Sequence, residues 1–329
     1  MYIAFFVTTI QNMISRRLSR IKTVKALYSH YKSGQENLSF SEGEFRTGVR
    51  KCYELYLLLL QLIVEVADYA EKRIEIAASK LMPTQEDLYP NRRFVDNEVI
   101  RVLRESRELS DALTRAKLAW KGQEQIIKSL YEAMTAAAYY KKYMALDPVS
   151  FADDRKIVTG FYQNHLEDNE QLEAVLEDMS MFWVDDVAFA ASHVISTIGA
   201  LRSPADRLQI LPMYKNDDDR QYTETLFNKS LVNAGEYMGY IDELTENWDF
   251  ERIAFMDKMI MLAAITELTQ FPTIPVKVTL DEFIEISKYY STAGSSVFIN
   301  GILDKAIEKL TAEGKIAKSG RGLIETSIK

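Results

Sequence analysis

"ERIAFMDKMIMLAAITELTQFPTIPVKVTLDEFIEISKYYSTAGSSVFINGILDKAIEKL" (residues 251–310) carries the clearest helical pattern in the chain. Its apolar run "MDKMIMLAAITEL" has the length and composition of a buried helix. Two prolines then stiffen a short connection, and "TLDE" (279–282) is typical of the cap that opens a further helix. "STAGSS" (291–296) separates that helix from a last one. The stretch therefore predicts three consecutive helices.

The rest of the chain has the same helical character. Its 329 residues include only 13 Gly and 7 Pro, which leaves little material for tight turns. "SEGE" (41–44) predicts the start of a long helix running towards Met82, and a helical pattern resumes from about Asn97 to Leu146, broken only near Gly122. "PVKVT" alternates like a strand but is too short and isolated to build a sheet. The predicted fold class is all-α.

Part of the chain resembles another part. "DDRKIVTGFYQNHLEDNEQLEAVLEDMSMFWVDDVAFA" (153–190) aligns with "DDRQYTETLFNKSLVNAGEYMGYIDELTENWDFERIAFM" (218–256). The matched pairs are Asp154 with Asp219, Arg155 with Arg220, Leu166 with Leu231, and Trp183 with Trp248. Two amphipathic helical pairs with similar packing needs would explain part of this likeness. The shared placement of Trp and Asp-Arg favours duplication of one supersecondary unit.

Motifs of catalysis and metal binding are missing from the sequence. There is no Gly-rich phosphate loop, no His-Glu-x-x-His and no Gly-x-Ser-x-Gly. The single cysteine, Cys52, excludes an internal disulfide and a Cys-based zinc site. The three histidines lie far apart, and none has the Glu-x-x-His spacing of a di-iron bundle. We therefore expect no catalytic residues, no metal and no cofactor.

A basic segment, "SRRLSRIKTVKALYSHY" (15–31), stands out in an acidic chain. Six Lys and Arg lie between residues 16 and 32 and no acid precedes Glu36, whereas the whole chain carries a formal charge of −8. Such a run is most often a solvated helix face. Its isolation favours contact with phosphates, which Arg binds bidentately. Because the segment is short and single, single-stranded RNA fits better than a duplex.

The residues before the basic segment do not have the order of a targeting signal. "MYIAFFVTTIQN" (1–12) is apolar and precedes the positive charge, whereas a secretory signal has the reverse order. This run and the later "LYLLLLQLIVEV" (55–66) are both too short to span a bilayer. We predict a cytoplasmic protein without a membrane segment. We also hypothesise that translation starts at Met13, so that residues 1–12 are a non-native or disordered leader.

Two separated motifs resemble the NusB family of bacterial transcription antitermination factors. "RRLSRIKTVKALYSHY" is similar to the family's Arg-rich arm and first helix, which ends in "ALYS". "MDKMIMLAAITEL", "TLDEFIEISKYYS" and "FINGILDKA" are similar to its carboxy-terminal half. The resemblance covers residues 13–35 and about 218–313. It implies two packed three-helix bundles and no enzymatic activity.

The resemblance also implies a function and its residues. Members bind the boxA element of nascent RNA together with NusE, a ribosomal protein of the small subunit, in an RNA polymerase antitermination complex that keeps rRNA transcription processive. The implied RNA contacts are Arg16, Arg17, Arg20, Lys22, Phe298 and Asn300. Tyr28 and Asp257 would lie on the surface that meets NusE. Core packing is the alternative for Phe298 and Tyr28. Gly301, which costs a helix about 1 kcal/mol relative to Ala, would permit a close approach of a helix or RNA.

The chain departs from the family by a large insertion and by weak basic character before Phe298. The expected organisation is a leader (1–12), the arm and first helix (13–35), an inserted helical region (36–216) that includes the repeat copy 153–190, and a NusB-like bundle (217–329). Ser295, Ser296 and Val297 stand where basic residues are expected. With a net charge of −8, RNA binding is expected to be cooperative with NusE. The alternative is a NusB-fold protein-interaction scaffold that has lost RNA binding.

Overall fold

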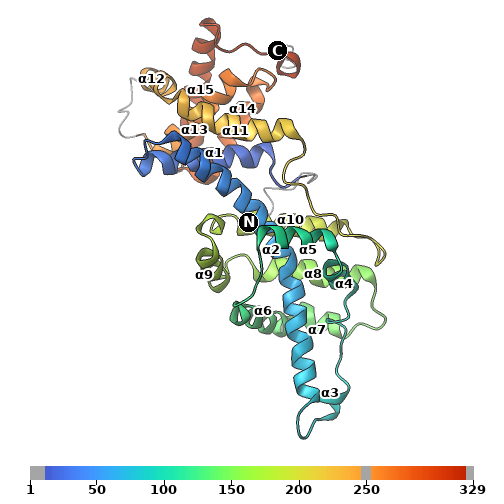
Figure 1. Ribbon diagram of the computed structural model, residues 1–329. Coiled ribbons are helices and arrows are strands. Elements are labelled where there is room, and N and C mark those ends of the chain that lie inside the picture. The colour runs from blue at the N-terminus through green and yellow to red at the C-terminus, as the bar shows by residue number, and fades with distance from the viewer. Residues whose placement is uncertain (1–11, 246–252, 324–329) are drawn as a thin grey trace. The chain divides into compact units, whose positions relative to one another are not determined.

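The computed structural model describes residues 12–245 and 253–323, and every regular element in these ranges is helical (Figure 1). The described residues form fifteen α-helices and contain no strand, which confirms the predicted all-α class. The expected leader, residues 1–12, lies outside the described part except for Asn12. No described helix is long and apolar enough to cross a membrane.

The chain divides into two compact units. The terminal unit comprises Ile14–Val49 and the chain from Tyr214 onwards, and the central unit comprises the chain from Arg50 to Met213 together with Met13. Helix α2 (Leu38–Ala78) contributes residues to both units, with the division falling between Val49 and Arg50.

Helix α13 (Phe255–Gln270) is the centre of the terminal unit. It packs against α1, α11, α12, α14 and α15, which comprise Arg16–Lys32, Asp217–Val232, Ala234–Leu244, Val276–Tyr290 and Ser295–Ala312. Residues 259–268 of α13 are all buried. A helix that is apolar on every side has to be enclosed by other helices, and Figure 1 shows α13 among its neighbours. The three helices predicted from residues 251–310 are thus observed as α13, α14 and α15.

The two predicted capping boxes are wrong, because both side chains are used in tertiary contacts. Helix α14 begins at Val276, one turn before "TLDE", and the Thr279 hydroxyl donates to Glu267 on α13 (2.7 Å). Helix α2 begins at Leu38, and Ser41 lies 2.7 Å from Nδ1 of His30. A hydroxyl inside a helix can serve a buried partner instead of a free backbone N–H.

The central unit encloses the middle of α2. Leu55, Leu58, Leu59 and Leu62 are buried completely, and two tryptophans donate to carbonyl groups of the same helix. Trp120 Nε1 donates to the Leu58 carbonyl (3.0 Å), and Trp183 Nε1 donates to that of Lys51 (2.7 Å). These contacts identify both tryptophans as core anchors; Trp248 lies outside the described residues.

The central unit also contains eight further α-helices and one 3₁₀ turn among the described residues. They are α3 (Gln85–Leu88), α4 (Glu98–Arg104), α5 (Arg107–Ala116), α6 (Glu124–Ala136), α7 (Ala138–Met144), α8 (Phe151–His165), α9 (Glu170–Met179), the 3₁₀ turn η2 (Met181–Trp183) and α10 (Val187–Ala200). The prediction of one helical stretch broken only near Gly122 is wrong. The chain also breaks after Arg104, where the Ser106 hydroxyl caps α5, and at Ala137, whose backbone is extended.

The two repeat copies contain the same order of helices. The first contains α8, α9 and α10, and the second contains α11, α12 and α13. In each copy, the aspartate that the alignment matches contacts the first residue of another helix. Asp154 accepts a hydrogen bond from the Glu98 backbone at the start of α4, and Asp219 accepts one from Arg16 at the start of α1. The likeness therefore extends from sequence to tertiary contacts.

Replacing Trp183 by Ala should destabilise the central unit by about 3–5 kcal/mol, because it removes a large buried side chain and its hydrogen bond to the Lys51 carbonyl. The matched control is Met181→Ala in the same 3₁₀ turn, where the side chain is exposed and the expected loss is below about 0.5 kcal/mol. Urea unfolding monitored by circular dichroism measures both. Equal losses for the two variants would contradict the assignment of Trp183 to the core.

Candidate functional site

The basic segment forms helix α1, which the Ser15 hydroxyl caps by accepting from the Leu18 backbone (3.2 Å). One face of the helix is buried in the terminal unit. Its apolar members are Leu18, Ile21, Val24 and Leu27. Tyr31, in the last turn of the same helix, is exposed. The arginines divide between this face and the surface.

Arg16 and Arg17 are partly exposed, and each has a carboxylate partner. Nε of Arg16 donates to Asp219 on α11 (2.9 Å), and the guanidinium lies 5.0 Å from the Tyr222 ring centroid. Nε and Nη2 of Arg17 donate to the two oxygens of Glu282 on α14, at 2.8 and 2.7 Å. This arrangement is the bidentate pair that a planar guanidinium forms with a carboxylate or a phosphate.

Arg20 lies inside the bundle. Its side chain is 4% exposed, and that of its partner Glu267 is 0% exposed. Nε and Nη2 of Arg20 donate to the two oxygens of Glu267 at 2.8 and 2.9 Å. Tyr222 and Thr279 donate to the same carboxylate. Arg20 was expected to contact RNA from the arm, but in this conformation it holds α1 against α13.

The charge state of Arg20 follows from these neighbours. Burial alone would lower the pKa of the Arg20 guanidinium, but Tyr222, Glu267 and Glu282 outweigh it and raise that pKa. Burial likewise raises the pKa of the Tyr222 hydroxyl, and the Glu267 charge raises it further. The carboxylate, the guanidinium and the neutral phenol therefore form one satisfied buried network.

The central unit lacks this ion pair at the equivalent place. Asp154 contacts the first residue of α4, and its counterpart Asp219 contacts the first residue of α1. When α4 and α1 are aligned from these first residues, Val102 is paired with Arg20. Leu201 and Glu267 each lie 11 residues beyond the aligned copies, which end at Ala190 and Met256, so continuing the alignment pairs them. Val102 and Leu201 are both buried. Apolar residues can replace a buried ion pair without loss of stability, and the central unit has an apolar residue at both matched positions.

Helices α1 and α14 lie side by side and run in the same direction. Arg17 pairs with Glu282, and eight residues later in both helices Lys25 lies over the Tyr290 ring, 5.1 Å from its centroid. Eight residues correspond to about 12 Å of helix. Lys22 lies between the two contacts in sequence and is partly exposed. Arg17, Lys25 and Tyr290 form a basic and aromatic strip along the pair, which we call the α1–α14 strip.

Phe298, Asn300 and Gly301 lie near the start of α15. Phe298 and Asn300 are partly exposed, and the Asn300 amide donates to Asp304 (3.1 Å). Gly301 is exposed, and a Cβ built there would meet no atom within 4 Å. Close packing of another described helix therefore does not explain this glycine, which leaves its surface open to a ligand.

Tyr28 and Asp257 lie near the opposite end of α1 from Arg16. The Tyr28 ring packs edge-on against Phe255 at the start of α13, with centroids 5.3 Å apart. Asp257 is buried and accepts hydrogen bonds from Ser291 and Ser295, the latter at 2.9 Å. Asp257 was expected on a partner surface, but it instead connects α13 to the turn that opens α15.

Glu267, Glu282, Tyr222 and Tyr290 are the residues of this region that sequence reasoning missed. The sequence did carry one signal: Glu267 is the single acid within the apolar run "MIMLAAITEL". A carboxylate in such a helix needs a cationic partner, because an unpaired buried charge is very costly. Arg20 of α1 is that cationic partner.

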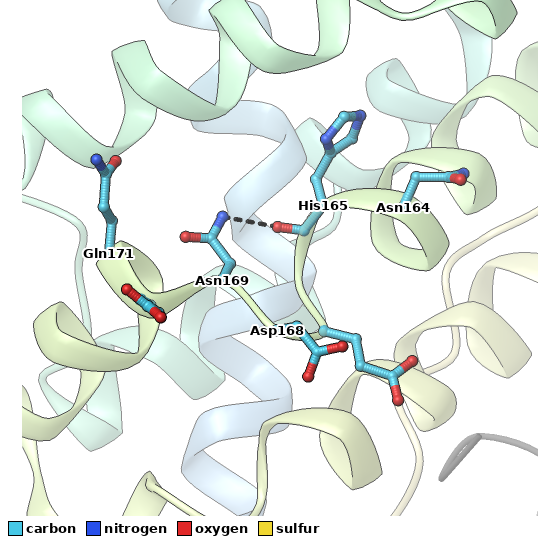
Figure 2. Close-up of a pocket in the computed structure, with 7 residues that line it drawn as sticks. Asn164, His165, Asp168, Asn169 and Gln171 are labelled. Carbon is cyan, nitrogen blue, oxygen red and sulfur yellow. Dashed lines mark hydrogen bonds between the residues drawn. The ribbon is translucent and has the colours of Figure 1, made fainter.

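Figure 2 shows a shallow pocket elsewhere, at the connection between α8 and α9 in the central unit. Its polar side chains serve the turn itself. Asn169 donates to the His165 carbonyl (2.9 Å) and accepts from the Leu172 backbone (3.0 Å), and His165 Nε2 lies 2.8 Å from the Tyr139 hydroxyl. Among the described residues, no group of three or more His, Cys, Asp or Glu is arranged to hold a metal. The α1–α14 strip is therefore the stronger candidate site.

Together, the fold and the site define an all-helical bundle protein whose candidate site is a basic helical surface. The NusB family matches residues 184–308. Transcription antitermination protein NusB of Salinibacter ruber is 39% identical over 114 residues, or 35% of this chain and 71% of that protein. The protein of the same name from Natranaerobius thermophilus is 34% identical over 133 residues, or 40% of this chain and 92% of the relative. The chain belongs to the NusB family.

Other comparisons add to this picture. The NusB protein of Chloroherpeton thalassium is 38% identical over 104 residues, or 32% of this chain and 49% of that protein. No solved structure matches the chain. In each of the three pairs the aligned part is well under half of this chain, which is longer than these relatives, as an insertion would make it.

Removing one partner of the buried pair should destabilise the terminal unit strongly. We expect Arg20→Ala to cost about 3–5 kcal/mol, because Glu267 is left charged and unpaired. Arg16→Ala removes a partly exposed pair on the same helix and should cost at most about 1 kcal/mol. The double variant Arg20→Met/Glu267→Leu should recover most of the loss. Urea unfolding measures all three, and similar losses for Arg16→Ala and Arg20→Ala would refute this account.

The Arg17–Glu282 pair should make stability depend on pH in the acid range. Burial raises the pKa of the Glu282 carboxyl, but the Arg17 hydrogen bond and the Arg20 charge outweigh it, so the pKa is lowered. The stabilisation is therefore complete above the unfolded-state pKa of about 4.3 and is lost as the pH falls through the lower folded-state pKa. The stability difference between wild type and Glu282→Gln, measured by urea unfolding from pH 7 to pH 3, should shrink below about pH 4. A difference that stays constant down to pH 3 would contradict this.

Proposed function

We propose that this protein is a transcription antitermination factor that binds boxA-type single-stranded RNA together with NusE, and so supports processive rRNA transcription. Membership of the NusB family carries the proposal, because the relatives compared above are named transcription antitermination proteins. In this proposal the protein acts by binding within the RNA polymerase complex and catalyses no reaction.

The α1–α14 strip is the proposed RNA contact. Arg16, Arg17 and Lys22 would meet phosphates, since they are partly exposed along one helix. Single-stranded RNA is held by basic side chains along its backbone and by aromatic rings on which bases stack. Tyr290 lies beside Lys25 on this strip, and Phe298 and Asn300 follow on the next helix. Arg20 is proposed to act indirectly, by holding α1 in place.

The NusE contact is proposed at the end of α1 that carries Tyr28. Tyr28 and Lys32 both meet Phe255 there, and all three lie at or near the surface. Asp257 would act through the turn it anchors, because its carboxylate is buried. The acidic chain repels RNA at long range, so a partner that adds contacts would be needed for tight binding.

One observation favours a second candidate function, a NusB-fold protein scaffold without RNA binding. Arg16, Arg17 and Arg20 all have carboxylate partners within the terminal unit. An arginine neutralised in this way offers an RNA phosphate less attraction than one surrounded by water. The scaffold and the RNA-binding protein make opposite predictions for the arm.

Binding of a fluorescent boxA-type RNA, measured by anisotropy with and without NusE over a range of salt, separates the two candidates. Under the proposed function, Lys22→Ala should weaken binding several-fold and reduce the slope of log affinity against log salt by about 0.7, the value for one lost contact on a single strand. Lys229→Ala, an exposed lysine on α11, is the matched control and should change neither. Absence of binding with NusE present, or equal effects of the two substitutions, would favour the scaffold.

A further inference from the structure

Glu282 occupies the place that a phosphate would take on the surface arginine of the arm. Its two oxygens accept from Nε and Nη2 of Arg17, at 2.8 and 2.7 Å. A phosphate offers a guanidinium the same pair of oxygens in the same plane. RNA therefore cannot bind this edge of Arg17 unless the carboxylate leaves.

The pair lies where such an exchange can occur. The side chains of Arg17 and Glu282 are 33% and 20% exposed, whereas those of Arg20 and Glu267 are 4% and 0% exposed. Glu282 also lies 3.4 Å from Nη1 of Arg20, but Arg20 keeps both of its shorter bonds to Glu267 without it. Displacement of Glu282 would thus leave the buried anchor of α1 in place.

We propose that Glu282 is an affinity determinant of the arm, an intramolecular carboxylate that competes with RNA phosphate for Arg17. The inference rests on the proposed RNA-binding function. While Glu282 is paired with Arg17, the arm binds RNA weakly by itself. Its affinity for RNA increases when other contacts, such as those through a protein partner, bring the RNA close.

The charge of Glu282 determines whether replacing this residue strengthens or weakens RNA binding. With Glu282 in place, Arg17 is already neutralised and contributes little to the release of counterions from RNA. The neutral amide of Glu282→Gln can still accept one hydrogen bond from Arg17 but no longer balances its charge. Arg17 then becomes available as an additional phosphate contact, so both the affinity and its salt dependence should increase.

The test measures anisotropy of a labelled boxA-type RNA with NusE for wild type, Glu282→Gln, Arg17→Ala and Arg17→Ala/Glu282→Gln. We expect Glu282→Gln to bind about three- to tenfold more tightly, with a slope against log salt that is steeper by about 0.7. The matched control is Asp281→Asn, which removes one negative charge from the neighbouring exposed residue of α14 and should change affinity less than twofold. The gain should vanish when Arg17 is Ala.

The possible results distinguish failure of the role proposed for Glu282 from failure of the proposed RNA-binding function. Equal affinities for Glu282→Gln and Asp281→Asn, or a gain that persists without Arg17, would overturn the role of Glu282 while leaving RNA binding intact. No RNA binding by wild type or any variant would overturn the proposed function and this inference with it. Circular dichroism shows whether Glu282→Gln keeps its helices. If Glu282→Gln loses helical structure, Glu282→Asp is tested in its place. This variant keeps the charge but reaches less far towards Arg17, so we expect a smaller gain in RNA affinity.

Discussion

The buried ion pair between Arg20 and Glu267 is the interaction on which the terminal unit depends. Helix α13 carries Glu267 through the centre of the unit, where no water can solvate a carboxylate. Four hydrogen bonds from Arg20, Tyr222 and Thr279 satisfy it. Because these donors come from α1, α11 and α14, one carboxylate fixes the positions of three helices around the fourth.

This constraint also shapes the surface of α1. With Arg20 and the apolar residues of α1 turned inwards, Arg17 remains at the surface beside α14, and Lys22 is also partly exposed. The same α14 provides Glu282 on the outside and Thr279 on the inside. The proposed RNA contact and the core of the bundle are therefore two faces of one pair of helices, and a change to the core network would be expected to disturb the surface.

The sequence predicted helices well and their contacts less well. Apolar periodicity and scarce glycine and proline are local properties, so the all-α class and the three helices of residues 251–310 followed from them. The caps at "SEGE" and "TLDE" failed because Ser41 and Thr279 bond to partners distant in sequence or outside their own helix. Arg16, Arg17 and Arg20 look alike in the sequence, and only tertiary structure shows that one is buried. The isolated acid Glu267 was the available signal for that difference.

The central claim, that the α1–α14 strip of the terminal unit binds RNA, is tested most directly by photo-crosslinking. A boxA-type RNA containing 4-thiouridine would be irradiated with the full-length protein and NusE, and the crosslinked peptides identified by mass spectrometry. We expect crosslinks within residues 16–32 of α1 and around Tyr290 and Phe298. Crosslinks confined to the central unit, or none above those of an unrelated RNA of equal length, would contradict it.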